Sequence, residues 1–96
     1  MKLGYLAALF AVTIGTAAHS APIESGAYLT RDWDKDYAQK LANEASALIR
    51  RAGYKCDSIS SLQRWLLSAG FDVVCNQFRY KYELEDKGGR WTVTLK

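Results

Sequence analysis

The N-terminal leader most constrains this chain, because it decides how many residues remain to fold and in which compartment they fold. Lys2 is followed by an apolar run from Leu3 to Gly15 and by small residues that lead to Ala21. This order of charge, apolar run and small residues is the layout of a secretory signal peptide. The run is shorter than the roughly 20 residues that a transmembrane helix needs. We therefore interpret residues 1–20 as a signal peptide and expect no membrane span after its cleavage.

Small side chains at the third and first positions before the scissile bond indicate where the leader is cut. Ala18 and Ser20 satisfy this requirement, which predicts Ala21 as the new N-terminus. A cut after Ala18 would leave His19 first, and an uncleaved N-terminal anchor is the third alternative. With a cut before Ala21 the mature chain has no histidine, which excludes Ser-His-Asp and Cys-His catalysis and most zinc sites. We predict no catalytic residue, no metal site and no cofactor.

Two cysteines remain in the mature chain, Cys56 and Cys75. A domain of this length buries too little surface to be very stable without a covalent staple. Exported proteins meet an oxidising compartment, which favours a disulfide between the two residues over two free thiols. Closing that loop would contribute about 3 kcal/mol in the chain-entropy estimate. A redox-active pair is disfavoured because there is no Cys-x-x-Cys motif.

Hydrophobic periodicity predicts one helix, over about residues 34–51, which ends at Gly53. Asp32 or Thr30 is positioned to cap its start. The expected apolar stripe has spacings of three and four, and consists of Trp33, Tyr37, Leu41, Ala45, Leu48 and Ala52. Residues 21–30 contain the only proline and show no apolar period, so we interpret them as a flexible lead-in.

The C-terminal part alternates between apolar and polar residues, which predicts a strand meander. Phe71–Cys75, a strand from Phe78 and a strand from Trp91 would share one apolar face, with Glu85 opposite Arg90 across the last turn. Residues 57–69 fit either a short helix or a strand near 54–60 followed by a wide loop. The serines favour the strand and loop slightly.

These elements predict a single small domain at residues 31–96. The expected fold class is α+β, with one N-terminal helix packed on a three- to four-stranded antiparallel β meander and one disulfide.

Arg64 and Trp65 are the predicted binding residues, because tryptophan and arginine favour interface hot spots and this pair would be exposed in a wide loop. Paired carboxylates suggest a small hydrolase as an alternative. The residues that would supply them are Asp57, Glu83, Glu85 and Asp86. Asp32, Asp34 and Asp36 begin like a calcium loop, but the glycine and glutamate that the EF-hand pattern requires are missing.

The formal net charge is +3, with basic and acidic residues interspersed, so no nucleic-acid footprint is expected. A membrane-active cationic protein is a further alternative, but the helix predicted over 34–51 has mixed charge and an acidic start. We expect an exported, non-enzymatic protein, periplasmic or secreted, that serves as a binding or inhibitor-type module. Its partner would be a protein or a cell-envelope component.

A resemblance extends over Tyr54–Lys96. It is carried by Tyr54-Lys55-Cys56, Gly70-Phe71, Val74-Cys75-Asn76, Tyr80-x-Tyr82 and Glu85-Asp86-Lys87-Gly88-Gly89-Arg90-Trp91-x-Val93. The segment resembles a type of short exported bacterial protein with a two-cysteine, β-rich C-terminal half. The resemblance implies export, a bacterial source and a disulfide-bonded β-rich unit, and it implies no activity.

Overall fold

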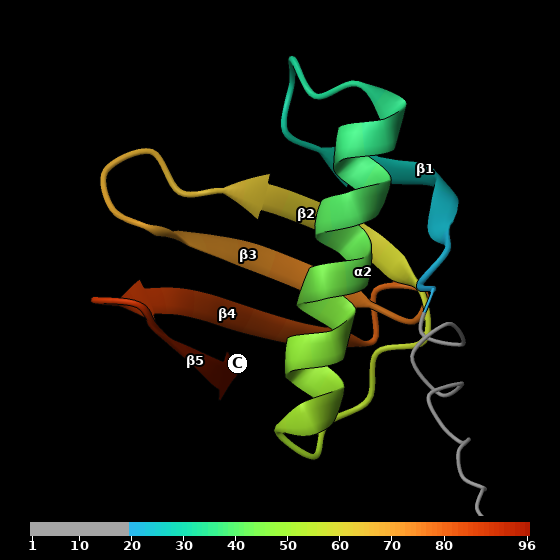
Figure 1. The fold of residues 1–96 in the computed structure, drawn as a ribbon. Helices are drawn as coiled ribbons and strands as arrows, with labels where there is room; N and C mark the ends of the chain where they lie inside the picture. The colour runs from blue at the N-terminus through green and yellow to red at the C-terminus, as the bar shows by residue number, and fades with distance from the viewer. Residues whose placement is uncertain (1–19) are drawn as a thin grey trace, which may run out of the picture.

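One helix crosses one face of a five-stranded sheet in the computed structural model, which describes residues 20–96 (Figure 1). The predicted signal peptide lies outside these residues, except for Ser20. The elements are β1 (Ile23–Leu29), α2 (Lys35–Arg51), β2 (Ile59–Arg64), β3 (Gly70–Cys75), β4 (Tyr80–Lys87) and β5 (Arg90–Leu95). The strands lie in chain order, with β1 and β2 parallel and the other neighbours antiparallel.

Strand β1 corrects the predicted lead-in and the predicted fold class. Residues 21–30 are not flexible lead-in, since Ile23–Leu29 pair with β2, and the sheet is mixed and five-stranded instead of an antiparallel meander of three or four strands. The pairing register shifts between Ile23 and Tyr28, around Gly26 at φ +83°. This irregularity removes the period-two pattern by which a strand is detected in a sequence. Helix α2 carries the chain back across the sheet, so β2 can run parallel to β1.

The bounds of the predicted helix are confirmed, but its capping residue is Asp34 and not the predicted Asp32 or Thr30. The Asp34 side chain caps the start by accepting a hydrogen bond from the Tyr37 backbone N–H at 2.8 Å, and Gly53 follows the end with φ +94°. The buried face shares only Ala45 with the expected stripe, and it consists mainly of small residues: Ala38, Ala42, Ala45, Ser46 and Ile49. Leu41 and Leu48 are only half-buried on the flank of the helix. The small side chains let α2 approach the sheet closely.

Residues 57–69 form a strand followed by a wide loop, the alternative that the serines favoured, although the strand begins at Ile59. Pairing of Ile59 with Cys75 across β2 and β3 brings the two cysteines within reach of each other.

At the last turn, Gly88 and Gly89 have φ +66° and +93°, and Arg90 pairs with Lys87. The predicted pairing with Glu85 is therefore wrong by two residues, although the apolar face is the one expected, since Leu84 lies opposite Val93.

The core lies between α2 and the sheet, around the disulfide. Its largest fully buried side chains include Ile49, Ile59, Leu62, Val73, Tyr82 and Leu84. The ends of the β2–β3 and β4–β5 hairpins extend past the helix on its left-hand side (Figure 1). Part of the apolar sheet face is therefore left without a helical cover. Within residues 20–96, no helix has both the length and the apolar character to cross a membrane.

Candidate functional site

An apolar cleft of about 240 Å³ lies between the flank of α2 and the sheet. Its lining consists of Leu41, Glu44, Ala45 and Leu48 from the helix and Leu62, Phe71, Leu84 and Trp91 from the strands. Glu44 is the one residue of this lining with a charged side chain. The cleft exists because alanines face the sheet while Leu41 and Leu48 form a wall beside it. Largely apolar concave surfaces of this kind are the usual sites for small ligands.

A row of aromatic rings leads from the cleft toward the start of α2. Trp91 stacks on Phe71 with ring centroids 6.0 Å apart, Phe71 lies 6.2 Å from Trp33, and Trp33 lies 5.7 Å from Tyr37. Trp91 is 39% exposed, although the alternation of its strand suggested a core residue. The row joins the cleft to a second hollow, which is lined by Thr30, Asp32, Trp33, Asp34, Tyr37 and Arg64.

Arg64, a predicted binding residue, lies where the cleft meets this second hollow. It pairs across the strands with Phe71, and its guanidinium carbon lies 5.4 Å from the Trp33 ring centroid. Its Nη2 donates to the Tyr37 hydroxyl at 3.3 Å. Within residues 20–96 no carboxylate lies close enough to Arg64 for an ion pair. Among the same residues, the indole N–H of Trp33 is buried and has no hydrogen-bond acceptor. Arg64 therefore forms no ion pair among the described residues, although Asp32 and Asp34 line the same hollow.

Trp65, the other predicted binding residue, lies away from Arg64. Its indole N–H donates to the Asp72 carboxylate at 3.0 Å, and its ring covers Gly70. The two residues do not form one contact point, because Trp65 bonds to Asp72 while Arg64 lies opposite Phe71, and these two successive residues of β3 point to opposite faces of the sheet.

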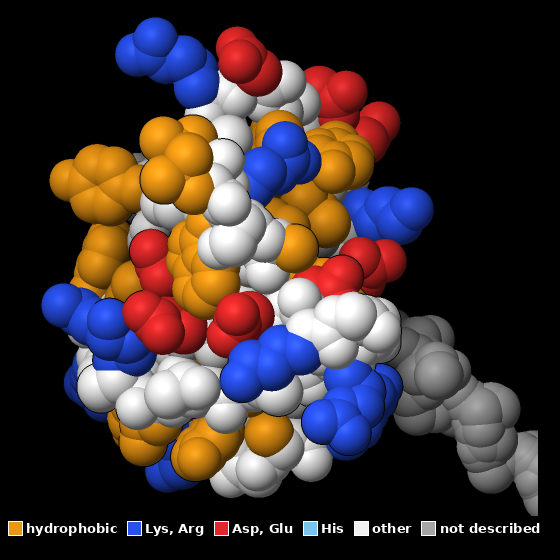
Figure 2. Space-filling view, turned by 90° about the vertical axis from the view of Figure 1, so that its left-hand side faces the viewer, with side chains coloured by type: hydrophobic (Ala, Val, Ile, Leu, Met, Phe, Trp, Pro, Cys, Tyr) orange, Lys and Arg blue, Asp and Glu red, His pale blue; other side chains and the backbone are white. Residues whose placement is uncertain are grey.

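The exposed apolar residues of this loop are the next two, Leu66 and Leu67, which are 95% and 97% exposed. Nothing in the sequence pattern singled them out. Figure 2 shows hydrophobic side chains gathered over the upper half of this end of the molecule, with acidic and basic ones around them.

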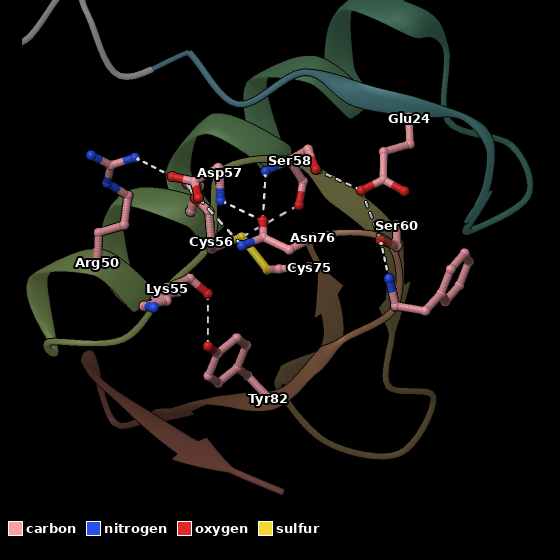
Figure 3. The surroundings of a disulfide bond; sticks show 12 residues. Glu24, Arg50, Lys55, Cys56, Asp57, Ser58, Ser60, Cys75, Asn76 and Tyr82 are labelled. Atoms are coloured by element: carbon pink, nitrogen blue, oxygen red, sulfur yellow. Dashed lines mark hydrogen bonds and ion pairs between the residues drawn. A yellow bond between two sulfur atoms is a disulfide. The ribbon is translucent and has the colours of Figure 1, made fainter.

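The predicted disulfide between Cys56 and Cys75 is confirmed, with the two Cα atoms 5.1 Å apart (Figure 3). Asn76, the residue after Cys75, accepts hydrogen bonds at Oδ1 from the backbone N–H groups of Asp57 and Ser58. The Tyr82 hydroxyl donates to the Lys55 carbonyl at 2.7 Å, and burial raises the pKa of this tyrosine. Hydrogen bonds with Asn76 and Tyr82 thus fix the backbone of residues 55–58 before and after Cys56.

Glu24 of β1 holds the turn after β3. Its Oε2 accepts hydrogen bonds from the Ser58 hydroxyl at 2.6 Å and the Ser60 hydroxyl at 2.9 Å (Figure 3). The same oxygen accepts the Gln77 backbone N–H at 2.9 Å. The turn has three successive non-glycine residues at positive φ, Asn76, Gln77 and Phe78. Such conformations persist only where surrounding contacts enforce them. The hydrogen bonds from Ser58, Gln77 and Ser60 lower the pKa of the Glu24 carboxyl, while burial opposes them.

We expect the stability of the protein to fall in acid because of Glu24. A lowered pKa in the folded state stabilises the fold above the usual value of 4.5, and this contribution is lost as the pH falls through the folded-state pKa. As the pH falls through this acidic range, the free energy of unfolding, measured with urea, should decrease less for Glu24→Gln than for the parent protein. Glu44→Gln, which removes an exposed carboxylate, should show the same dependence of stability on pH as the parent protein. If the stability of Glu24→Gln and of the parent falls equally with pH, Glu24 is not the cause of the loss in acid.

The carboxylates of the hydrolase alternative are not brought together. Glu83 and Glu85 lie on the polar sheet face, where they pair with Lys96 at 2.9 Å and Lys87 at 3.9 Å. The hydrogen bond and charge of Glu83 raise the pKa of Lys96.

Asp86 accepts the Gly89 N–H in the last turn, and Asp57 pairs with Arg50 beside the disulfide. Within the described part of the chain, no three His, Cys, Asp or Glu side chains are grouped to hold a metal ion.

Comparison with protein-family models, with curated proteins and with solved structures finds no match to this chain.

Proposed function

We propose that the protein is an exported, non-enzymatic binding module whose cleft beside α2 holds an apolar part of a cell-envelope component. The observation that carries this proposal is the cleft itself, with Trp91 partly exposed at the sheet and Glu44 as its one charged lining side chain. Hydrocarbon surface left open to water lowers the stability of a small domain. A concave apolar surface that is nevertheless kept open favours a binding role.

The lining favours a hydrocarbon ligand over a protein segment. Apart from the Glu44 carboxylate and the Trp91 indole N–H, the side chains around the cleft supply no hydrogen-bonding group. A peptide placed there would bury backbone amides without partners, at a cost of about 1–3 kcal/mol each. An acyl chain has no such groups, so within the envelope a lipid-derived component fits the lining better than a polypeptide.

Leu48→Asp should weaken the binding of decanol, a neutral hydrocarbon probe, by at least about tenfold, because it places a charge in the cleft wall. The measurement is titration followed by tryptophan fluorescence, since Trp91 lines the cleft. Leu66→Asp is the matched control, because the same change occurs at an exposed position. Urea unfolding should show that both variants fold. Parent-like decanol binding by folded Leu48→Asp would reject the cleft as the site.

Export and cleavage before Ala21 form the second part of the proposal. Ala21 is 2% exposed, its backbone N–H donates to Asn43 Oδ1 at 2.9 Å, and its carbonyl accepts from Gln39 Nε2 at 2.8 Å. Ser20 is exposed. Ala21, the residue that the predicted cut would leave first, is thus held against α2. The disulfide supports an oxidising compartment.

Expression of the full-length chain in a Gram-negative bacterium tests the export proposal. Mass spectrometry of the periplasmic extract should show a chain that begins at Ala21 and is lighter by the two hydrogens lost on oxidation. Ala18→Arg should leave the precursor uncut, because the third position before the cut requires a small residue. Recovery of an intact, reduced parent chain from the cytosol would contradict export.

A further inference from the structure

Arg64 supplies a charged end to the apolar cleft. Its cross-strand partner is Phe71, which lines the cleft, and directly opposed residues on one sheet face have Cβ atoms about 5 Å apart. The guanidinium also lies over Trp33, whose ring follows Phe71 in the aromatic row. A single ligand can therefore occupy the cleft and reach the guanidinium.

The guanidinium lacks a carboxylate partner among residues 20–96, although Asp32 and Asp34 line the same hollow. Stacking on Trp33 and the hydrogen bond to Tyr37 restrain the guanidinium, and most of its N–H donors have no acceptor in the described residues. This planar fork matches the two oxygens of a carboxylate. The site thus favours a ligand with an anionic group at one end.

The neighbouring acids select against a doubly charged group. Asp32 and Asp34 lie around the hollow, so a phosphate monoester would be repelled more strongly than a carboxylate. The apolar lining of the cleft meanwhile requires a ligand body without amides. A single carboxylate on a hydrocarbon chain meets both requirements.

We propose that the cleft binds a medium-chain aliphatic monocarboxylate, with its hydrocarbon chain between α2 and the sheet and its carboxylate on Arg64. The inference rests on the proposed function, since it names the ligand class of the same cleft. Arg64 sets the preference for the carboxylate, and the apolar lining supplies the affinity that is independent of charge.

Titration of the oxidised protein with decanoate and decanol near neutral pH tests this proposal. We expect decanoate to bind at least about tenfold more tightly than decanol, as a bidentate charged pair allows. Arg64→Gln should remove this preference by weakening decanoate alone. Arg64→Lys should retain part of it, because the charge remains and the fork is lost. Arg79→Gln, a change of an exposed arginine in the β3–β4 turn, should bind like the parent.

The outcomes separate this inference from the proposed function. Equal binding of decanoate and decanol, or an equal loss of both in folded Arg64→Gln, overturns the monocarboxylate proposal and leaves the apolar cleft in place. Failure of the parent protein to bind either probe overturns the proposed function itself. Tighter binding of an apolar peptide with a free C-terminus than of decanoate also overturns the proposal, because it would assign the carboxylate to a polypeptide.

Discussion

Replacement of both cysteines by serine is expected to lower the free energy of unfolding by about 3 kcal/mol. Cys56 and Cys75 are separated by 19 positions, so their bond removes the entropy of a loop of that length from the unfolded chain. Both residues are completely buried in the core. Their hydroxyl replacements would also have to be desolvated, which adds to the loss. For a domain of this size, such a change removes a large part of the total stability.

Urea unfolding of the double variant, of the oxidised parent and of the reduced parent measures this loss. The double variant should unfold at the lowest urea concentration, the reduced parent somewhat above it, and the oxidised parent at a clearly higher concentration. Ser46→Ala is a suitable control, because it removes the hydrogen bond to the Cys56 carbonyl and keeps the disulfide. It should cost about 1 kcal/mol. Coinciding transitions for the oxidised parent and the double variant would show that the bridge does not stabilise the fold.

Gly70→Ala is expected to destabilise the protein by about 3 kcal/mol, at the upper end of the range for overpacking. A Cβ at this position would lie 2.4 Å from Trp65 Cε3 and 2.7 Å from the Leu84 carbonyl oxygen. Neither neighbour can move freely. The Trp65 ring is held by its hydrogen bond to Asp72, and the Leu84 carbonyl is part of the β4 backbone. Relief therefore requires a shift of the sheet itself.

A double-mutant cycle with Trp65→Ala resolves the two contacts. Removing the ring should recover part of the stability lost in Gly70→Ala, since the contact with the Leu84 carbonyl remains. The measurement is the urea midpoint of the two single variants and the double variant. A Gly70→Ala variant as stable as the parent would show that the sheet relaxes around the added methyl group.

Several features of the fold follow from residues close together in the chain. Asp34 and Gly53 mark the two ends of the helix through capping and positive φ, which are local properties. The two glycines at residues 88–89 likewise place the last turn. Alternation identified the apolar face of β4 and β5, but not their register, because a shift of two residues leaves the faces unchanged.

The cleft could not be predicted, because it depends on which flank of α2 meets the sheet. Spacing alone made Leu41 and Leu48 the expected core stripe. The folded chain instead packs Ala42 and Ala45 against the sheet and leaves the leucines as a wall. Two apolar stripes overlap on this helix, and only the shape of the opposing sheet selects between them.

For Arg64, too, the sequence indicated one property and the tertiary structure decided another. Its residue type suggested a binding role, whereas its position over Trp33, which precedes the helix, results from packing between distant segments. Strand β1 is a further case, since its partner lies beyond the helix in the chain.

The sequence by itself determined the ends of the helix, the last turn and the cysteine pair, because capping, backbone freedom and sulfur chemistry act between near neighbours or have a single available partner. Tertiary structure decided the parallel edge strand, the rotation of α2 and the apolar cleft with its arginine, because these depend on contacts between residues far apart in the chain.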